Sequence, residues 1–237
     1  MNRGIDMNTY TERRSQIETY FDRTAADAWA RLTSDAPVGR VRATVRAGRD
    51  RMRQTLLSWL PEDLRGQQVL DAGCGTGALA VEAALRGAQV LAIDLSPTLV
   101  DLARERQPMF DSGGRIDFRS GDMLDPALGS FDYVIGMDSL IHYEPGDAVE
   151  VIAGLAQRTR QALLFTFAPS SPALELFKAA GKLFPRGDRS PAIVPVAERQ
   201  LRRRLDEHPH LLAWDQGRSQ RISSGFYTSH AMELVRS

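Results

Sequence analysis

A glycine-rich loop between an apolar strand and a helix carries the residues with the clearest chemical meaning. Residues 69–77 read Val-Leu-Asp-Ala-Gly-Cys-Gly-Thr-Gly, and Asp94 ends the next apolar run, 21 residues after Gly73. Glycines let backbone N–H groups approach a ligand closely. A carboxylate at the end of the following strand can accept hydrogen bonds from two ribose hydroxyls. Together these residues predict a site for a ribose-containing cofactor.

The length of the loop and the residue before it indicate which cofactor. A dinucleotide-binding loop has the spacing Gly-x-Gly-x-x-Gly, whereas the third glycine here, Gly77, comes one residue early. Asp71 stands just before the loop, and a carboxylate there suits an ammonium group rather than a pyrophosphate. These features resemble the motif of the class I S-adenosylmethionine (SAM)-dependent methyltransferases.

That resemblance implies a Rossmann-like sheet with SAM as the methyl donor. It also implies that Asp122, which follows the third strand, caps the adenine. Cys74 lies inside the loop, where we expect it to fill space rather than to react, because a nucleophile needs a neighbouring base. The residues expected at the cofactor are Asp71, Gly73, Cys74, Gly75, Gly77, Asp94, Leu95, Asp122, Met123 and Met137.

Alternating strand and helix patterns surround the loop and predict how it is positioned. Short apolar runs bounded by turn residues predict strands, and helical periodicity with glycine or proline at the ends predicts helices. This alternation is typical of an α/β fold with a mostly parallel sheet, here ending in an antiparallel C-terminal hairpin. We expect strands over 68–71, 89–94, 116–119, 133–137, 162–167, 211–222 and 226–235, and helices over 79–86, 97–106, 146–158 and 197–207.

The sequence before the sheet predicts an N-terminal helical arm and cap over residues 1–62, followed by the methyltransferase domain over 63–237. Apolar residues recur every three or four positions from Val41 to Trp59, which predicts an amphipathic helix. Prolines interrupt the alternation of strands and helices after the strand expected at 162–167, so we expect an insertion at about 169–196.

The composition excludes several classes of protein. The 237 residues carry 30 basic and 30 acidic side chains, so no net basic field favours nucleic acid. One cysteine and four histidines without metal-binding spacing argue against a protein-bound metal. No apolar run approaches the roughly 20 residues of a membrane span, and the N-terminus lacks a signal-peptide pattern. We therefore expect a cytoplasmic protein.

The segment after the fourth strand indicates which class of molecule accepts the methyl group. Residues 136–143 read Gly-Met-Asp-Ser-Leu-Ile-His-Tyr, without the Pro-Pro-aromatic pattern of base N-methyltransferases or the Pro-Cys of cytosine C5 enzymes. Together with Tyr-Phe-Asp at 20–22 and the arginine-rich segment 44–49, it resembles the magnesium-protoporphyrin IX O-methyltransferases of chlorophyll and bacteriochlorophyll synthesis. The resemblance covers nearly the whole chain, but residues 25–29 lack the Gly-Phe and Arg-Trp expected near them.

This second resemblance implies that one propionate of the macrocycle is esterified. It implies catalytic roles for Tyr20 and His142 and a substrate contact for Phe21. A propionate has a pKa of about 4.5 and is ionised at neutral pH, so the acceptor oxygen needs orientation more than deprotonation. Tyr20 and His142 would then donate hydrogen bonds to it, although a packing role stays open for both.

Arginines on the amphipathic helix are candidates for binding a second propionate. Arg46 and Arg49 recur on one stripe, and a guanidinium matches a carboxylate in a planar, two-bond geometry. The alternative is that the stripe is a solvated helix face. The magnesium ion would belong to the substrate, so we expect no metal site on the protein.

The resemblance also implies partners. We expect a tetrapyrrole as substrate, its handover from the large subunit of magnesium chelatase, and at most peripheral contact with a photosynthetic membrane. Three alternatives stay open: a SAM-dependent O-methyltransferase for another small hydrophobic acceptor such as a quinone precursor, a domain that binds SAM without transferring a methyl group, and a dinucleotide oxidoreductase, which the loop length disfavours.

Overall fold

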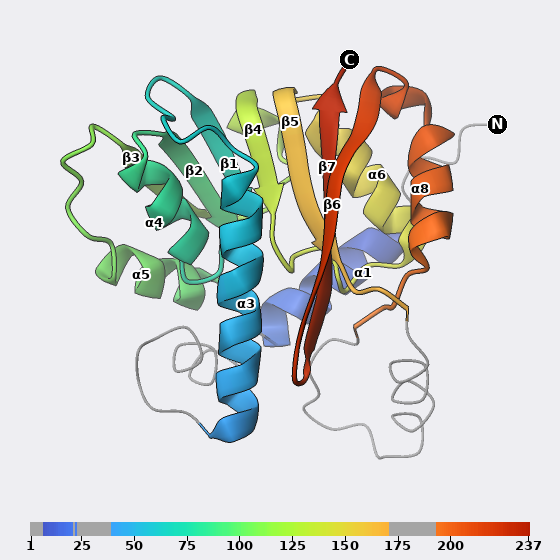
Figure 1. Ribbon diagram of the computed structural model, residues 1–237, viewed down its shortest axis with the longest axis horizontal. Coiled ribbons are helices and arrows are strands. Elements are labelled where there is room, and N and C mark those ends of the chain that lie inside the picture. The colour runs from blue at the N-terminus through green and yellow to red at the C-terminus, as the bar shows by residue number, and fades with distance from the viewer. Residues whose placement is uncertain (1–6, 21, 23–38, 171–192) are drawn as a thin grey trace.

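A seven-stranded sheet is the centre of the computed structural model, which describes residues 7–20, 22, 39–170 and 193–237 (Figure 1). The strand order is β3-β2-β1-β4-β5-β7-β6, in which β7 alone runs antiparallel to both of its neighbours. The strands are β1 (Gln68–Ala72), β2 (Gln89–Asp94), β3 (Arg115–Ser120), β4 (Phe131–Gly136), β5 (Thr159–Phe167), β6 (Trp214–Ser224) and β7 (Tyr227–Arg236).

The position of β1 in this order places the glycine loop. β1 pairs with β2 on one side and with β4 on the other, so the direction of strand succession reverses there. Its residues 69–72 are all buried, so both faces of the strand are covered, as expected of a central parallel strand. Ligands of open α/β sheets bind outside the carboxyl ends of the strands at such a reversal.

Helices cover both faces of the sheet. On one face α3 (Arg40–Ser58), α4 (Ala78–Leu85) and α5 (Pro97–Glu105) bury apolar side chains in one cluster with the sheet. On the other face α1 (Met7–Thr19), α6 (Pro145–Ala156) and α8 (Glu198–Asp206) contribute to a second cluster. Two short 3-10 turns, η2 (Pro126–Leu128) and η3 (Pro209–Leu211), complete the described elements.

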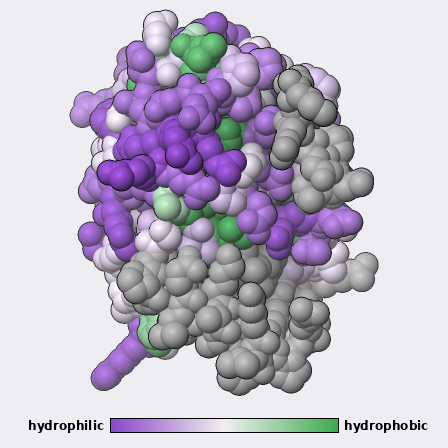
Figure 2. All heavy atoms as spheres, turned by 90° about the vertical axis from the view of Figure 1, so that its right-hand side faces the viewer, coloured by the Kyte–Doolittle hydropathy of each residue, from purple (hydrophilic) through white to green (hydrophobic). Residues whose placement is uncertain are grey.

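Helix α8 shows how the periodicity of one helix separates core from surface. Leu201 and Leu205 are buried, whereas Arg199, Arg203 and Arg204 are exposed. Figure 2 shows the side of the molecule that carries α8, and the part of this surface coloured by hydropathy is predominantly hydrophilic. The arginine-rich sequence of this helix is therefore compatible with its packing against α6.

The expected fold class is confirmed, including the antiparallel C-terminal hairpin. Two boundaries differ by three residues, and the others lie within two residues of the expected ones. Strand β5 begins at Thr159, three residues before the expected start, because Thr159 pairs with Phe131 of β4 ahead of a register shift that precedes the Tyr133–Ala162 pair. Strand β6 begins at Trp214 instead of 211, because η3 occupies the residues just before it.

The N-terminal arm and the insertion are described in part. α3 occupies the expected amphipathic helix and packs against α4, β6 and β7. A bridge between Pro169 and Val196 joins the two ends of the expected insertion, whose residues 171–192 lie outside the described part of the chain. The boundary at residue 62 stays a prediction.

Two glycines with the same backbone angle offer a matched test of packing around the loop. Gly77 and Gly66 both have φ of +77°, but a Cβ on Gly77 would lie 2.7 Å from the Phe118 ring, whereas a Cβ on Gly66 would meet nothing within 4 Å. We expect Gly66→Ala to lower the free energy of unfolding by about 1 kcal/mol through backbone strain, and Gly77→Ala by about 2–4 kcal/mol because a clash is added. Urea denaturation measures both, and equal losses would contradict the described packing.

Candidate active site

A cavity of about 280 Å³ lies at the carboxyl ends of β1, β2 and β4. Its wall also includes residues of α1 and α3. Of the ten residues expected at the cofactor, Gly77 is not on the wall; it is the N-cap residue of α4. The nine that line the cavity are Asp71, Gly73, Cys74, Gly75, Asp94, Leu95, Asp122, Met123 and Met137.

Backbone hydrogen bonds hold the glycine loop against the neighbouring strand. The N–H groups of Gly73 and Cys74 both donate to the carbonyl oxygen of Ile93, at 2.8 and 3.0 Å. Gly73 has φ of +86°, and a Cβ there would lie 2.4 Å from the Cβ of Ser139. The loop therefore needs glycine at this position both for its backbone angle and for its close approach to the segment after β4.

Asp94 is oriented by two backbone donors. Its Oδ2 accepts from the N–H of Gly75 at 2.8 Å, and its Oδ1 accepts from the N–H of Ser96 at 3.0 Å. Burial raises the pKa of the Asp94 carboxyl, while these hydrogen bonds lower it. A carboxylate oxygen has more than one acceptor position, so this fixed group can still accept from two adjacent hydroxyls.

Asp71 contributes a second carboxylate to the same wall. It is 2% exposed, and its Oδ2 has no hydrogen-bond partner. Burial, with the charge of Asp94 as the second cause, raises the pKa of Asp71 to about 7. A buried carboxylate with an unsatisfied oxygen is stabilised by a cation. The wall therefore fits a ligand that has both ribose hydroxyls and an ammonium group.

The positive charge of Arg104 lowers the pKa of the Cys74 thiol, but it is the smallest of the causes that act on this group. Burial raises its pKa, and the carboxylates of Asp94 and Asp71 raise it further. A raised pKa keeps the thiol protonated and weakens it as a nucleophile. This environment agrees with the expected space-filling role.

Asp122 connects the cavity wall to α1. Its Oδ1 accepts from the hydroxyl of Tyr10 at 2.8 Å, and its Oδ2 accepts from Nη1 of Arg14 at 2.7 Å. Tyr10 also stacks on Tyr143, with ring centroids 5.5 Å apart. Sequence reasoning missed Tyr10 and Arg14, whose four-residue spacing places them on one face of a helix. The adenine-capping role of Asp122 stays a prediction.

The residues after α1 reach the start of α5. The Oδ1 of Asp22 accepts from the hydroxyl of Thr98 at 2.6 Å and from the hydroxyl of Ser96 at 3.3 Å. Tyr20 is half-buried and is not among the residues that line the cavity. Phe21 lies outside the described residues. Asp22 belongs to the Tyr-Phe-Asp motif found in the sequence, which gave it no role; the structure shows that it anchors this part of the arm beside the end of β2.

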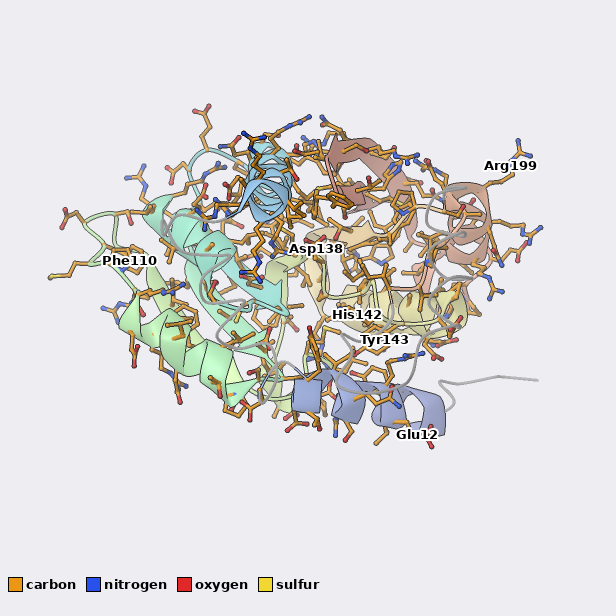
Figure 3. All side chains as sticks on the ribbon, turned by 90° about the horizontal axis from the view of Figure 1, so that it is seen from below. Glu12, Phe110, Asp138, His142, Tyr143 and Arg199 are labelled. Carbon is orange, nitrogen blue, oxygen red and sulfur yellow. The ribbon has the colours of Figure 1, made fainter. Side chains whose placement is uncertain are left out.

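His142 and the two arginines lie on the cavity wall. His142 is buried in the segment after β4, between the helices α1 and α3 in the view from below (Figure 3). Arg46 and Arg49 line the cavity from α3. Nη1 of Arg49 lies 2.6 Å from Oδ2 of Asp138, a residue that sequence reasoning did not select. The cavity thus brings carboxylates, a histidine and arginines together.

Comparison with known proteins shows which family this chain belongs to. The family model described as "Magnesium-protoporphyrin IX methyltransferase C-terminus" matches residues 136–236, and one described as "Methyltransferase domain" matches 69–162. The magnesium-protoporphyrin O-methyltransferase of Rhodobacter capsulatus is 50% identical over 225 residues, which cover 94% of this chain and 97% of that protein. The chain belongs to the magnesium-protoporphyrin O-methyltransferase family.

The chain is also similar to a solved structure over nearly its whole length, and to a second group of enzymes over about half of it. The crystal structure of magnesium protoporphyrin IX methyltransferase from Synechocystis PCC 6803 with bound SAH is 31% identical, has a TM-score of 0.82, and is matched over 94% of this chain and 100% of that chain. A ubiquinone biosynthesis O-methyltransferase of Xanthomonas euvesicatoria is 38% identical, but over only 53% of this chain and 55% of that enzyme. The family resemblance drawn from the sequence is confirmed.

Two further observations concern the described residues alone. None of their helices is long and apolar enough to span a membrane. No group of three or more His, Cys, Asp or Glu side chains among them could hold a metal ion.

The raised pKa of Asp71 leads to a prediction about stability without ligand. The folded protein holds this proton up to about pH 7, whereas the unfolded chain releases it near pH 3.8. The contribution of Asp71 to stability is therefore present at low pH and is lost as pH rises from 4 to 7. The loss is about 4 kcal/mol at most, since a tenfold change in proton affinity is worth about 1.4 kcal/mol.

We expect Asp71→Asn to remove this loss, so that the variant gains stability relative to the wild type as the pH rises. Urea denaturation of the ligand-free proteins at pH 5 and pH 8 measures it. Asp111→Asn, which removes an exposed carboxyl, is the matched control. A wild-type and variant difference that does not change between the two pH values would show that Asp71 is ionised throughout.

Proposed function

We propose that this protein transfers the methyl group of SAM to a propionate carboxylate of magnesium-protoporphyrin IX and forms the monomethyl ester. The observation that carries the proposal is the 50% identity with the Rhodobacter enzyme of that name over nearly the full length of both chains. The product is an intermediate of chlorophyll and bacteriochlorophyll synthesis.

The wall with Asp71 and Asp94 is the part of the cavity suited to the cofactor. Asp94 would accept hydrogen bonds from the ribose hydroxyls, and Asp71 would offset the charge of the ammonium group. Leu95, Met123 and Met137 give this wall apolar surface for a flat base. When bound, SAM supplies an electrophilic methyl carbon.

The other side of the cavity is suited to an anionic acceptor. A propionate is already ionised at neutral pH, so orientation rather than proton removal is what the protein must supply. His142 would donate a hydrogen bond to the acceptor oxygen, and Tyr20 would do the same from the arm, next to the substrate contact proposed for Phe21. Arg46 and Arg49 would bind the second carboxylate and so fix the orientation of the macrocycle.

The C-terminal half of the chain favours this acceptor over a quinone precursor. The Xanthomonas ubiquinone enzyme matches little more than half of this chain, whereas the family model for magnesium-protoporphyrin methyltransferases covers 136–236. That range contains the segment with His142 and the hairpin of β6 and β7. The family model for magnesium-protoporphyrin methyltransferases thus covers the segment that carries the proposed acceptor residue His142.

The proposed function also includes two expected partners, the large subunit of magnesium chelatase and a membrane surface. The substrate is a large, mostly apolar macrocycle, so direct transfer from the large subunit of magnesium chelatase would keep it out of water. Peripheral contact with a membrane would serve the same purpose. Residues 171–192 of the expected insertion, one candidate for such contact, lie outside the described residues.

A direct assay tests the proposed reaction. The purified protein is incubated with methyl-labelled SAM and magnesium-protoporphyrin IX, and the label is followed into a monomethyl ester by chromatography. We expect label in the ester with the magnesium substrate. Metal-free protoporphyrin and a ubiquinone-type catechol are the comparison acceptors. Binding of SAM by calorimetry with no ester formed, or faster methylation of the catechol, would refute the proposal.

Two substitutions should separate the cofactor side from the acceptor side. We expect Asp94→Ala to weaken SAM binding about 10- to 100-fold, because two charge-assisted hydrogen bonds are lost. His142→Ala should lower kcat about 100-fold while the Kd for SAM stays within about twofold, because only the acceptor loses its orientation. Calorimetry and the ester assay measure the two effects. Wild-type turnover in His142→Ala would make that histidine a packing residue.

A further inference from the structure

Asp138 has an unusual backbone conformation at the edge of the cavity. It lies two residues after the end of β4, and its φ is +55°, in the left-handed region. Among the residues that the structure describes, no other non-glycine residue has a positive φ. This conformation costs about 1–2 kcal/mol outside glycine and persists only where the surroundings hold it. The contacts that keep Asp138 in this conformation therefore indicate its role.

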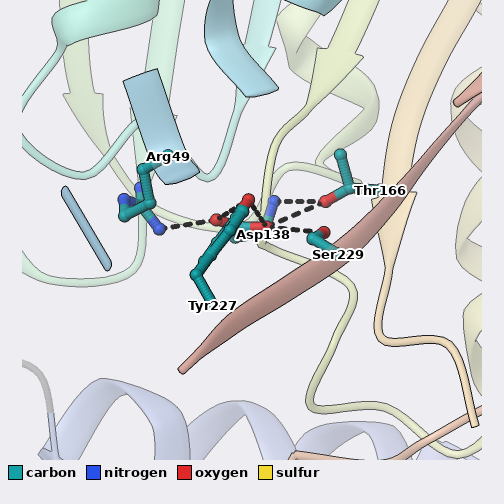
Figure 4. A network of polar contacts seen from close by, with 5 residues as sticks. All are labelled: Arg49, Asp138, Thr166, Tyr227 and Ser229. Carbon is teal, nitrogen blue, oxygen red and sulfur yellow. Dashed lines mark hydrogen bonds and ion pairs between the residues drawn. The ribbon is translucent and has the colours of Figure 1, made fainter. Parts of the chain in front are cut away.

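The Asp138 network is the set of hydrogen bonds around this side chain, formed with Arg49, Thr166, Tyr227 and Ser229 (Figure 4). The carboxylate accepts from Arg49 at 2.6 Å and, at 3.1 Å, from the hydroxyls of Thr166, Tyr227 and Ser229. The N–H of Asp138 donates to the hydroxyl of Thr166 at 2.7 Å. These partners come from α3, β5 and β7, so one carboxylate joins three elements to the segment after β4.

The packing of Tyr227 shows that the Asp138 network is built into the contact between α3 and the hairpin. A Cβ on Gly48 of α3 would lie 2.5 Å from Cδ1 of Tyr227, so the ring fits only against a glycine. Burial, with the Asp138 charge as a second cause, raises the pKa of the Tyr227 phenol. The phenol therefore stays protonated and donates to the carboxylate.

The charges of Asp138 and Arg49 affect how the cavity wall interacts with an anionic acceptor. Asp138 lines the cavity with its side chain only 6% exposed, and a second carboxylate brought next to it would be repelled. Arg49 lines the same cavity and offsets that charge. The pair also fixes the guanidinium plane, because a guanidinium that binds a carboxylate is held in a defined geometry.

We propose that Asp138 is a positioning residue for the anionic substrate: through its ion pair it holds the Arg49 guanidinium on the cavity wall, where it would bind the second carboxylate. Through the hydroxyls of β5 and β7 it holds the start of the segment that carries His142. This inference rests on the proposed function, because only an anionic acceptor needs an arginine oriented in this way.

The test is a kinetic comparison of Asp138→Asn with the wild type. Asparagine tolerates positive φ and keeps an oxygen for the hydroxyl donors, so the fold is retained. We expect kcat to fall at least tenfold, because Arg49 is no longer held. The KM for magnesium-protoporphyrin IX should stay level or fall, because a negative charge has left the cavity wall. A loss of general structure would instead raise KM and weaken SAM binding.

A double-mutant cycle tests whether Asp138 acts through Arg49. We expect the variant with both Asp138→Asn and Arg49→Gln to be no slower than Arg49→Gln alone. Asp132→Asn is the matched control, since it removes a carboxylate paired with Arg160 at 3.0 Å at the opposite end of β4. Its kcat should stay within twofold of the wild type.

The outcomes separate the two proposals. No ester from the wild type refutes the proposed function and this inference with it. Ester from the wild type at an unchanged rate in Asp138→Asn refutes this inference alone. Additive losses in the cycle, or a raised KM together with weaker SAM binding in Asp138→Asn, also overturn it. If Asp138→Asn does not fold, Tyr227→Phe replaces it, which removes one donor to the carboxylate; unchanged kcat there would overturn the inference.

Discussion

The presence of two carboxylates, buried Asp71 and half-buried Asp94, on one cavity wall is the constraint on which the rest of the site depends. Asp71 belongs to β1 and Asp94 ends β2, and parallel pairing of these strands brings both to the same edge of the sheet. Two charges so close together and out of water repel each other. Asp94 is stabilised by backbone donors, whereas Asp71 keeps an unsatisfied oxygen. A cationic ligand removes this penalty, which makes the wall selective for one.

Helix α3 brings the complementary charge to the same cavity. Arg46 and Arg49 reach the cavity from α3, and Asp138 holds one of them. A cavity lined by both carboxylates and arginines can receive a cationic donor and an anionic acceptor at the same time. The two ligands then attract each other where they meet, so electrostatics assists the alignment that an in-line displacement needs. Helix α3 is therefore as much a part of the site as the glycine loop.

The parts of the structure that local sequence determines were predictable. The glycine loop, the central strands and most helix boundaries follow from apolar runs and turn residues, and the spacing from Gly73 to Asp94 predicted two residues that line the same cavity. The Asp138 network was not predictable, because its partners lie 28 to 91 residues away in the sequence. The same holds for Tyr10 and Arg14, which meet Asp122 across more than 100 residues. Such contacts depend on how helices and strands pack, and a periodic pattern in one segment carries no information about them.

The most direct test of this account is the number of protons released when SAM binds. At pH 6.5 the ligand-free protein should hold a proton on Asp71, whose pKa is about 7, and the arriving ammonium group should displace it. Calorimetric titrations in buffers of different ionisation enthalpy should show release of roughly half to one proton per bound SAM. In Asp71→Asn the release should be close to zero. Binding without proton release in the wild type, or equal release in the variant, would contradict the account.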